Sequence, residues 1–181
     1  MIIGNKIRLR AIEREDIPRF VLWMNDPEVI KYLLMNAPLS KAMEEKWFEK
    51  QLEKPVTESQ ILAIEAQVGD EWVHIGNTGL HYMEPVTHES EFGIVIGNKD
   101  FWNKGYGREA ARLILKHGFE NLNLNRIYLY VVAENVRGIK AYEAAGFIKE
   151  GVLRQALYKN GKYNDIVVMS VLHSEWKGFE G

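Results

Sequence analysis

Two glycines separated by one residue stand where a strand-like segment gives way to a helix-like one. The stretch beginning at Glu91 reads EFGIVIGNKDFWNKGYGREA, and Gly105 and Gly107 stand at the start of its helical part. Glycine lets the backbone approach a ligand closely, and the first N–H groups of a helix have no partner within the helix. These donors and the positive end of the helix dipole can bind an anion such as a pyrophosphate. Lys104 and Arg108 add positive charge beside them.

Other phosphate-binding motifs fit the chain less well. A P-loop needs Gly-Lys followed by Ser or Thr, but Gly161-Lys162 is followed by Tyr163. A dinucleotide-binding fingerprint tolerates Ala110 at its third glycine position, yet Glu134 is a poor candidate for the acidic residue that the fingerprint expects further on. Two glycines before a helix are also common as a simple loop and cap, so this segment alone leaves the choice open.

Hydrophobic periodicity predicts the elements that position the glycine loop. Strands are predicted over 6–12, 59–67, 72–83, 90–97 and 126–133, and a terminal hairpin over 147–158 and 162–172 turns at Asn160-Gly161. Helices are predicted from about Asp16, from Asp26-Pro27, from Ser40, over 106–122 and over 135–145. The helix after Ser40 has the apolar stripe Met43, Trp47, Phe48 and Leu52, and the helix over 106–122 has Ala111, Leu115, Phe119 and Leu122.

The order of these elements indicates the fold class. One strand, two or three helices, three strands, a helix, a strand, a helix and two strands predict a mixed α/β (α+β) fold. Its sheet is twisted and mostly antiparallel, with one right-handed parallel crossover and helices on both faces. The strand over 126–133 is apolar on both faces, as expected of a central strand covered by helices. With 181 residues and no linker, a single domain spanning 1–181 is expected.

A second segment, NVRGIKAYEAAGF from Asn135 to Phe147, makes the pattern specific. Together with "EFGIVI", "FWNKGYGREA" and "EGVLR", it resembles the acetyl-CoA-binding motifs of the GNAT N-acetyltransferase superfamily. The branch that it resembles contains the RimJ/RimL-type ribosomal-protein acetyltransferases and the spermidine acetyltransferases. The resemblance spans nearly the whole chain. It implies a sheet of about seven strands with a splayed central pair, and transfer of an acetyl group from acetyl-CoA to a primary amine.

The resemblance also implies which residues bind acetyl-CoA. The strand residues would pair with the pantetheine arm as an added strand would, and the Val95 N–H would face the thioester oxygen. The loop would surround the pyrophosphate, and Asn135 would cap the next helix and touch the cofactor. The implied cofactor-binding residues are Ile94, Val95, Ile96, Trp102, Asn103, Lys104, Gly105, Tyr106, Gly107, Arg108, Asn135 and Tyr142.

Tyr142 matches the family tyrosine that points at the thioester sulfur, so the resemblance implies a general acid for the departing thiolate. Glu91 matches an acidic position of the same branch and is expected to act as a base or to bind the ammonium. A core tyrosine and a solvated strand-end carboxylate are the alternative interpretations. His81 is a second candidate base or a sheet histidine, and Tyr32 and Leu33 are expected near the acceptor.

The acceptor stays open at this stage. The region 30–43 contains no carboxylate, whereas spermidine acetyltransferases carry several there, so polyamine specificity is in doubt. A small-molecule amine and a peptide N-terminus are both compatible with this apolar region. A non-catalytic acyl-CoA-binding sensor or interaction module is the alternative from another class. The chain has no cysteine and no serine nucleophile elbow, which favours direct attack in a ternary complex over an acyl-enzyme.

Bulk properties set the remaining expectations. The net charge of −2 and the absence of a basic block argue against a nucleic-acid partner. No stretch approaches the ~20 apolar residues that cross a bilayer, and the N-terminus does not resemble a signal peptide, so a soluble cytoplasmic protein is expected. Histidine spacings give no support for a metal site. Exposed sheet edges would allow a homodimer.

Overall fold

The structure is a computed structural model that describes residues 1–35 and 38–178. One sheet has the strand order β1-β2-β3-β4-β5-β6-β8-β7. Its strands are β1 (Ile2–Ile3), β2 (Ile7–Ala11), β3 (Gln60–Val68), β4 (Glu71–Glu84), β5 (Glu89–Ile96), β6 (Arg126–Val132), β7 (Ile148–Lys159) and β8 (Lys162–Leu172). The α-helices are α1 (Ile17–Met24), α2 (Lys41–Glu53), α3 (Tyr106–Asn121) and α4 (Val136–Ala145). Short 3₁₀ turns are η1 (Arg14–Asp16), η2 (Ile30–Tyr32), η3 (Lys99–Phe101) and η4 (His173–Glu175).

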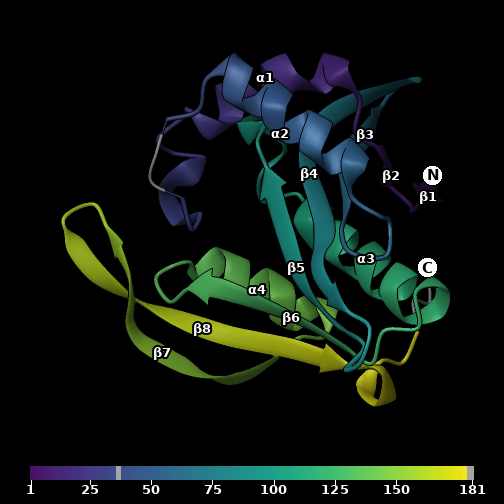
Figure 1. The fold of residues 1–181 in the computed structure, drawn as a ribbon, viewed down its shortest axis with the longest axis vertical. Helices are drawn as coiled ribbons and strands as arrows, with labels where there is room; N and C mark the ends of the chain where they lie inside the picture. Colours follow the sequence, from purple (N-terminus) through teal and green to yellow (C-terminus); the bar gives the residue numbers. More distant parts are fainter. Residues whose placement is uncertain (36–37, 179–181) are drawn as a thin grey trace.

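Every neighbouring pair of strands is antiparallel except β5 and β6. Helices α1 and α2 lie over one face of the sheet, and α3 and α4 lie on the other (Figure 1). The predicted mixed, mostly antiparallel sheet with helices on both faces is therefore confirmed. It has eight strands among the described residues rather than about seven, because β1 is only two residues long and too short to produce a periodic pattern.

The parallel pair β5–β6 is joined over three residues only. Pairing runs from Glu89 with Arg126 to Glu91 with Tyr128, and the two strands then diverge. Figure 1 shows β5 rising toward α1 and α2 while β6 turns toward the β7–β8 hairpin. This divergence confirms the predicted splayed central pair, and it places Glu91 and Tyr128 at the closed end of the gap.

The largest hydrophobic cluster lies between the sheet and α3. Ala111, Leu115 and Phe119 are buried there, as their helical spacing predicts. The stripe predicted for α2 is wrong at both ends, because Met43 and Leu52 are exposed. Only one narrow face of α2 is covered, and it buries Phe48 beside α1.

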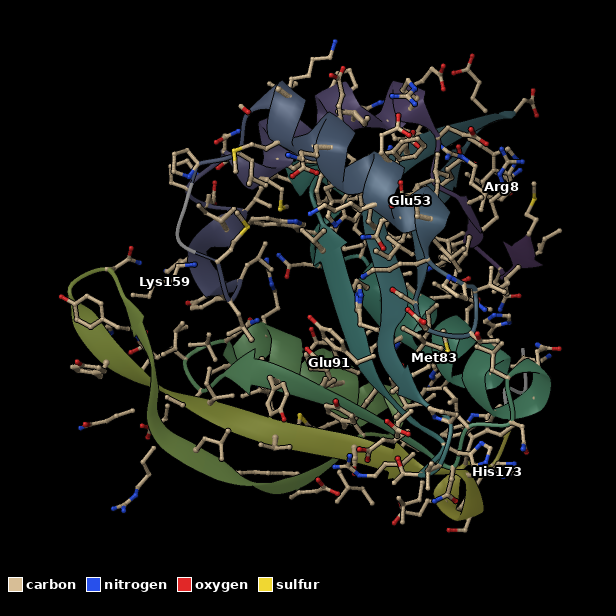
Figure 2. The ribbon with its side chains drawn as sticks, viewed as in Figure 1. Arg8, Glu53, Met83, Glu91, Lys159 and His173 are labelled. Atoms are coloured by element: carbon tan, nitrogen blue, oxygen red, sulfur yellow. The ribbon has the colours of Figure 1, made fainter. Side chains whose placement is uncertain are left out.

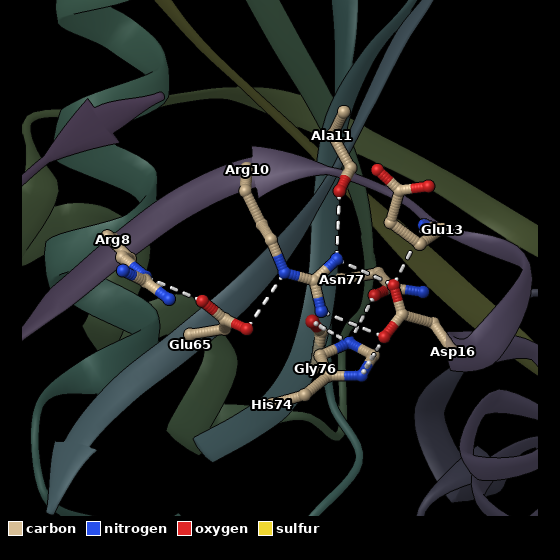
Figure 3. A network of polar contacts seen from close by, with 9 residues as sticks. All are labelled: Arg8, Arg10, Ala11, Glu13, Asp16, Glu65, His74, Gly76 and Asn77. Atoms are coloured by element: carbon tan, nitrogen blue, oxygen red, sulfur yellow. Dashed lines mark hydrogen bonds and ion pairs between the residues drawn. The ribbon is translucent and has the colours of Figure 1, made fainter. Parts of the chain in front are cut away.

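Helix α1 is linked to the sheet through a network of charged side chains. Arg10 of β2 donates two hydrogen bonds to Asp16, at 2.7 and 2.8 Å, and a third to Glu65 of β3 at 2.8 Å (Figure 3). His74 of β4 lies 3.1 Å from Asp16. Burial opposes ionisation of Asp16, but the hydrogen bonds from Arg10 and His74 outweigh it and hold the pKa of Asp16 well below its usual range. The carboxylate at the start of α1 thus stays charged and links the helix directly to β2 and β4, and through Arg10 to β3.

Two further expectations are corrected. The helix predicted to open at Asp26-Pro27 is a turn followed by η2, because the Asp26 carboxylate accepts the Glu28 N–H at 2.8 Å and organises only a single turn. The strand predicted to be covered on both faces, β6, is covered on one, since Tyr130 on its other face is 39% exposed.

The terminal hairpin has the predicted turn. Asn160 and Gly161 both have positive φ, 51° and 77°, as a type I′ turn requires. Strand β7 forms an open edge of the sheet, and the homodimer expected from such an edge stays a prediction. No helix within the described residues is long and apolar enough to cross a membrane.

Candidate active site

A cavity of about 480 Å³ opens beside the diverging end of β5. Its walls come from four parts of the chain that are distant in sequence: the segment 28–33, the end of β5, the loop into α3, and the start of α4. The lining residues are Glu28, Val29, Lys31, Tyr32, Leu33, Ile94, Val95, Ile96, Phe101, Trp102, Asn103, Gly105, Tyr106, Gly107, Arg108, Asn135, Arg137, Gly138, Ala141 and Tyr142.

The N-terminus of α3 forms one end of this cavity. Gly105 is the N-cap residue, with a left-handed φ of 87°, and it has no side chain to cap the helix. The first amide of the helix that bonds within it is that of Glu109, which donates to the Gly105 carbonyl at 3.0 Å. The preceding amides of α3 therefore point into the cavity mouth without a side-chain partner, which is the arrangement that binds phosphate groups.

Trp102 and Arg137 fix the loop that leads into α3. The Trp102 indole N–H donates to the Ile96 carbonyl at 2.7 Å, and the Arg137 guanidinium lies over the indole ring, 4.3 Å from its centroid. The Asn135 side chain accepts the Gly138 N–H at 3.0 Å and caps α4, as predicted. Arg137 brings a positive charge to the cavity that the sequence analysis missed, because an arginine in the first turn of a helix has no pattern of its own.

The register of β5 with β4 shows that the Val95 N–H does not face the gap, contrary to the expectation from the sequence. The Gly97 N–H donates to Ile75 of β4, so the alternation of an antiparallel ladder turns the Val95 N–H toward β4 as well. The same alternation turns the polar groups of Ile94 and Ile96 toward the gap left by β6. The N–H groups available to a thioester oxygen are therefore those of Ile94 and Ile96, although Val95 lines the cavity as expected.

Tyr142 lies at the other end of the cavity, on α4. Its ring packs edge-on against Phe92, at 6.0 Å between centroids, and against Phe147 at 5.9 Å. Burial raises the pKa of Tyr142 to about 12, so the phenol keeps its proton at neutral pH. Within residues 1–35 and 38–178 no side chain or backbone group is hydrogen-bonded to this hydroxyl, which leaves it available to a ligand.

A row of polar side chains crosses the sheet at the closed end of the gap. Glu91 is paired with His81 of β4 on one side and with Tyr128 of β6 on the other, so all three side chains project from the same face. Figure 2 shows Glu91 at the point where the two strands part. Burial raises the pKa of Glu91 and lowers that of His81. Burial, with the nearby Glu91 carboxylate as a smaller contribution, raises the pKa of Tyr128.

Tyr130 extends this row along β6, and its ring packs edge-on against Tyr128 at 5.7 Å between centroids. Neither tyrosine was predicted from the sequence to belong to the site, although their alternation along a strand beside Glu91 indicates a shared face. Two aromatic rings next to a carboxylate are a suitable environment for an ammonium group.

The residues predicted from the sequence fall into two places. The large cavity brings together every predicted cofactor residue except Lys104, which is exposed and lies 5.8 Å from the Phe101 ring centroid. Tyr32 and Leu33 line the same cavity, whereas His81 and Glu91 lie outside it at the closed end of the gap. Residues 36 and 37 of the predicted acceptor region lie outside the described residues.

The comparisons with known proteins agree with this geometry. Residues 6–148 match the acetyltransferase (GNAT) domain family, and the chain belongs to this family. It is 30% identical to a spermidine N(1)-acetyltransferase of Vibrio cholerae over 96% of this chain and 97% of that protein. A putative ribosomal N-acetyltransferase of Bacillus subtilis, YdaF, is 36% identical over 57% of this chain and 56% of that protein. The crystal structure of a V. cholerae spermidine N-acetyltransferase in complex with CoA and spermine superposes with a TM-score of 0.87 at 27% identity, covering 95% of this chain and 98% of that one.

The protein is therefore an N-acetyltransferase that uses acetyl-CoA as cosubstrate and acetylates an amine. The chain's own residues fit this cosubstrate, because uncapped helix amides suit a diphosphate and the free edge of β5 suits the amide groups of a pantetheine arm. The alternative of a non-catalytic sensor on the same fold is set aside. Among the described residues, no three histidine or acidic side chains are grouped so that they could hold a metal ion.

Gly107 provides a test of the cavity as the cofactor site. A Cβ at this position would lie 3.9 Å from Ile96 and 4.0 Å from Ile94, so a larger side chain fits the fold but projects toward the cavity. We expect Gly107→Leu to raise the KM for acetyl-CoA about tenfold or more, equivalent to about 1.4 kcal/mol of binding, while the melting temperature is unchanged or higher. Gly107→Ala is the matched control and should leave the KM nearly unchanged. An unaltered KM in the leucine variant would place the cofactor elsewhere.

Proposed function

We propose that the acceptor is a small primary amine with a single positive charge, bound at the closed end of the gap between β5 and β6. The observation that carries this proposal is the row formed by His81, Glu91 and Tyr128, which lies where the two strands part. Glu91 is the carboxylate of this row, and burial disfavours the positively charged form of His81, so His81 does not neutralise it. One carboxylate beside two tyrosine rings matches one ammonium group.

The charges around the cavity argue against a polycation. No aspartate or glutamate occurs between Glu28 and Glu44, and Lys31 and Arg137 both line the cavity. A substrate with several ammonium groups that extended from Glu91 into the cavity would meet three cations, Lys31, Arg108 and Arg137, and one anion, Glu28. Like charges in a partly enclosed site repel each other strongly. The acceptor of the V. cholerae relative is for this reason not assigned to this chain.

A peptide N-terminus is the second candidate acceptor. The segment beside the cavity presents apolar side chains, and Leu34 is 49% exposed there. An extended peptide with one α-amino group would have a single positive charge at the reacting end. The two candidates differ in size rather than in the chemistry of the amine.

Tyr142 has the geometry expected of a general acid. In the reaction the amine nitrogen forms a bond to the carbonyl carbon, and the carbon–sulfur bond breaks. The sulfur leaves as a thiolate and needs a proton, which the Tyr142 phenol donates because its raised pKa keeps it protonated. The proton that the nitrogen releases on becoming an amide restores the phenol. The Ile94 N–H donates to the carbonyl oxygen while negative charge develops on it.

Glu91 is proposed to accept the proton that the ammonium group must lose before attack. Burial raises the pKa of this carboxyl group, which makes it a better base near neutral pH than an exposed glutamate. In its charged form it also attracts the ammonium group, so binding and deprotonation use the same side chain.

A panel of amines tests the acceptor class. Purified protein with acetyl-CoA is challenged in turn with monoamines, amino sugars, aminoglycosides, spermidine and short peptides, and free CoA is measured with a thiol reagent. We expect the highest kcat/KM with a compound that has one amino group, and a clearly lower value with spermidine. Preference for spermidine would overturn the charge argument, and preference for peptides would select the second candidate.

Replacing Tyr142 tests the general acid. Tyr142→Phe removes the hydroxyl but keeps the ring against Phe92 and Phe147, so the fold should be preserved. We expect kcat to fall about 100-fold or more while the dissociation constant for acetyl-CoA changes little. Calorimetric titration measures the binding and steady-state kinetics the rate. A variant as fast as the wild-type protein would exclude this role.

Replacing Glu91 tests the base through its pH dependence. In the wild-type protein, kcat/KM should fall with decreasing pH through a pKa above the usual glutamate value, because the carboxylate becomes protonated. In Glu91→Gln this acidic fall in kcat/KM should be absent, and kcat/KM at neutral pH should be at least about tenfold lower than in the wild-type protein.

The melting temperature of Glu91→Gln distinguishes a role of Glu91 as a base from a purely structural role. A raised pKa means that the folded state binds the proton more tightly, so stability declines as pH rises through that pKa. Glutamine has no charge to bury, and we expect the variant to melt at the wild-type temperature or above it at pH 7. A slower variant that is also less stable would contradict the assignment.

A further inference from the structure

Lys159 is a buried cation that the proposed chemistry does not use. It stands at the end of β7, directly before the turn of the hairpin, and only 7% of the residue is exposed. Its ammonium group donates three hydrogen bonds to backbone carbonyls, to Ile30 at 2.6 Å, to Leu33 at 2.6 Å and to Met35 at 2.9 Å. An ammonium group has three N–H donors, so all of them are used.

No acidic side chain in the described part of the chain is paired with Lys159, and burial lowers its pKa. Removing a charge from water is costly, and hydrogen bonds to a charged donor offset that cost only when their geometry is good. Lys162, three residues further along the same hairpin, shows the contrast. It is exposed and forms an ion pair with Glu134, an arrangement that contributes little to stability.

The three carbonyls belong to the segment that forms one wall of the cavity. Lys31, Tyr32 and Leu33 of this segment line the cavity, and residues 30–35 contain no fully buried side chain. The segment therefore has little apolar burial of its own to hold it in place. Figure 2 shows Lys159 reaching from the hairpin toward this segment, which is 124 to 129 residues away in sequence.

We propose that Lys159 is a positioning residue that fixes the acceptor-side wall of the cavity. By holding the carbonyls of η2 and the residues after it, the ammonium group keeps Tyr32 and Leu33 in place for the part of the acceptor that extends from Glu91 into the cavity. The effect acts on recognition rather than on the chemical step, because Lys159 does not line the large cavity. The proposal rests on the proposed function, in which the amine bound beside Glu91 extends into this cavity to meet acetyl-CoA, but not on Tyr142 or Glu91 acting as acid and base.

Lys159→Met tests the proposal, because methionine keeps an unbranched apolar stem and has no N–H donor. With the best acceptor from the panel, we expect the KM for the amine to rise about tenfold. The value of kcat should stay within about twofold, as expected when binding is lost and the chemical step is not. Lys162→Met is the matched control and should leave both constants unchanged. Lys159→Arg, which retains a charged donor, should recover most of the affinity.

Hydrogen exchange gives a readout that needs no acceptor. In Lys159→Met, the amides of residues 30–35 should exchange at least about tenfold faster than in the wild-type protein, while those of α3 stay protected. Faster exchange with no active acceptor would support the positioning role and count against the proposed function instead. If the methionine variant does not fold, Lys159→Gln, which removes the charge and keeps a shorter neutral donor, should show a smaller change in the same direction. An unchanged KM with unchanged exchange, or a fall in kcat equal to the rise in KM, would overturn the proposal.

Discussion

The divergence of β5 from β6 after Glu91 and Tyr128 is the constraint on which the site depends. A strand that loses its neighbour inside a sheet leaves backbone donors and acceptors without partners, which is costly unless something else binds them. Here the Trp102 indole N–H donates a hydrogen bond to the Ile96 carbonyl, and the polar groups of Ile94 face the cavity. The gap is thus both an interruption in the sheet and a surface that can pair with the amide groups of an extended ligand.

The two faces of the sheet contribute different chemistry to this gap. From one side, α3 and α4 bring the uncapped amides beside Gly105 and the phenol of Tyr142. From the other, the strand row brings Glu91 next to Tyr128. An amine and a thioester that approach from opposite faces would meet where the strands part. This arrangement explains why the cavity that Tyr142 lines does not also include Glu91.

Much of this organisation could be predicted from the sequence, because it depends on local signals. The glycine loop, the Asn135 cap and the Asn160-Gly161 turn follow from the conformational preferences of those residue types. The direction of the Val95 N–H could not be predicted, since it depends on register with β4. The contacts of Lys159 could not be predicted, because its partners are backbone carbonyls, which every residue type has. The exposure of Tyr130 depends on which elements cover that face of β6, and the periodicity within one strand does not report this.

The separate attachment of α1 and α2 has a consequence for how this enzyme can diversify. Their buried residues Ile17, Met24 and Phe48 lie outside the main hydrophobic cluster, which joins α3 to the sheet. The α1–α2 layer is tied to the strands by the charged side chains around Asp16 and by its own small core. Substitutions in that layer can therefore accumulate without loosening the half of the molecule that contains α3 and the glycine loop. The fold is therefore modular: the α1–α2 layer can vary in sequence while the packing of α3 on the sheet is kept.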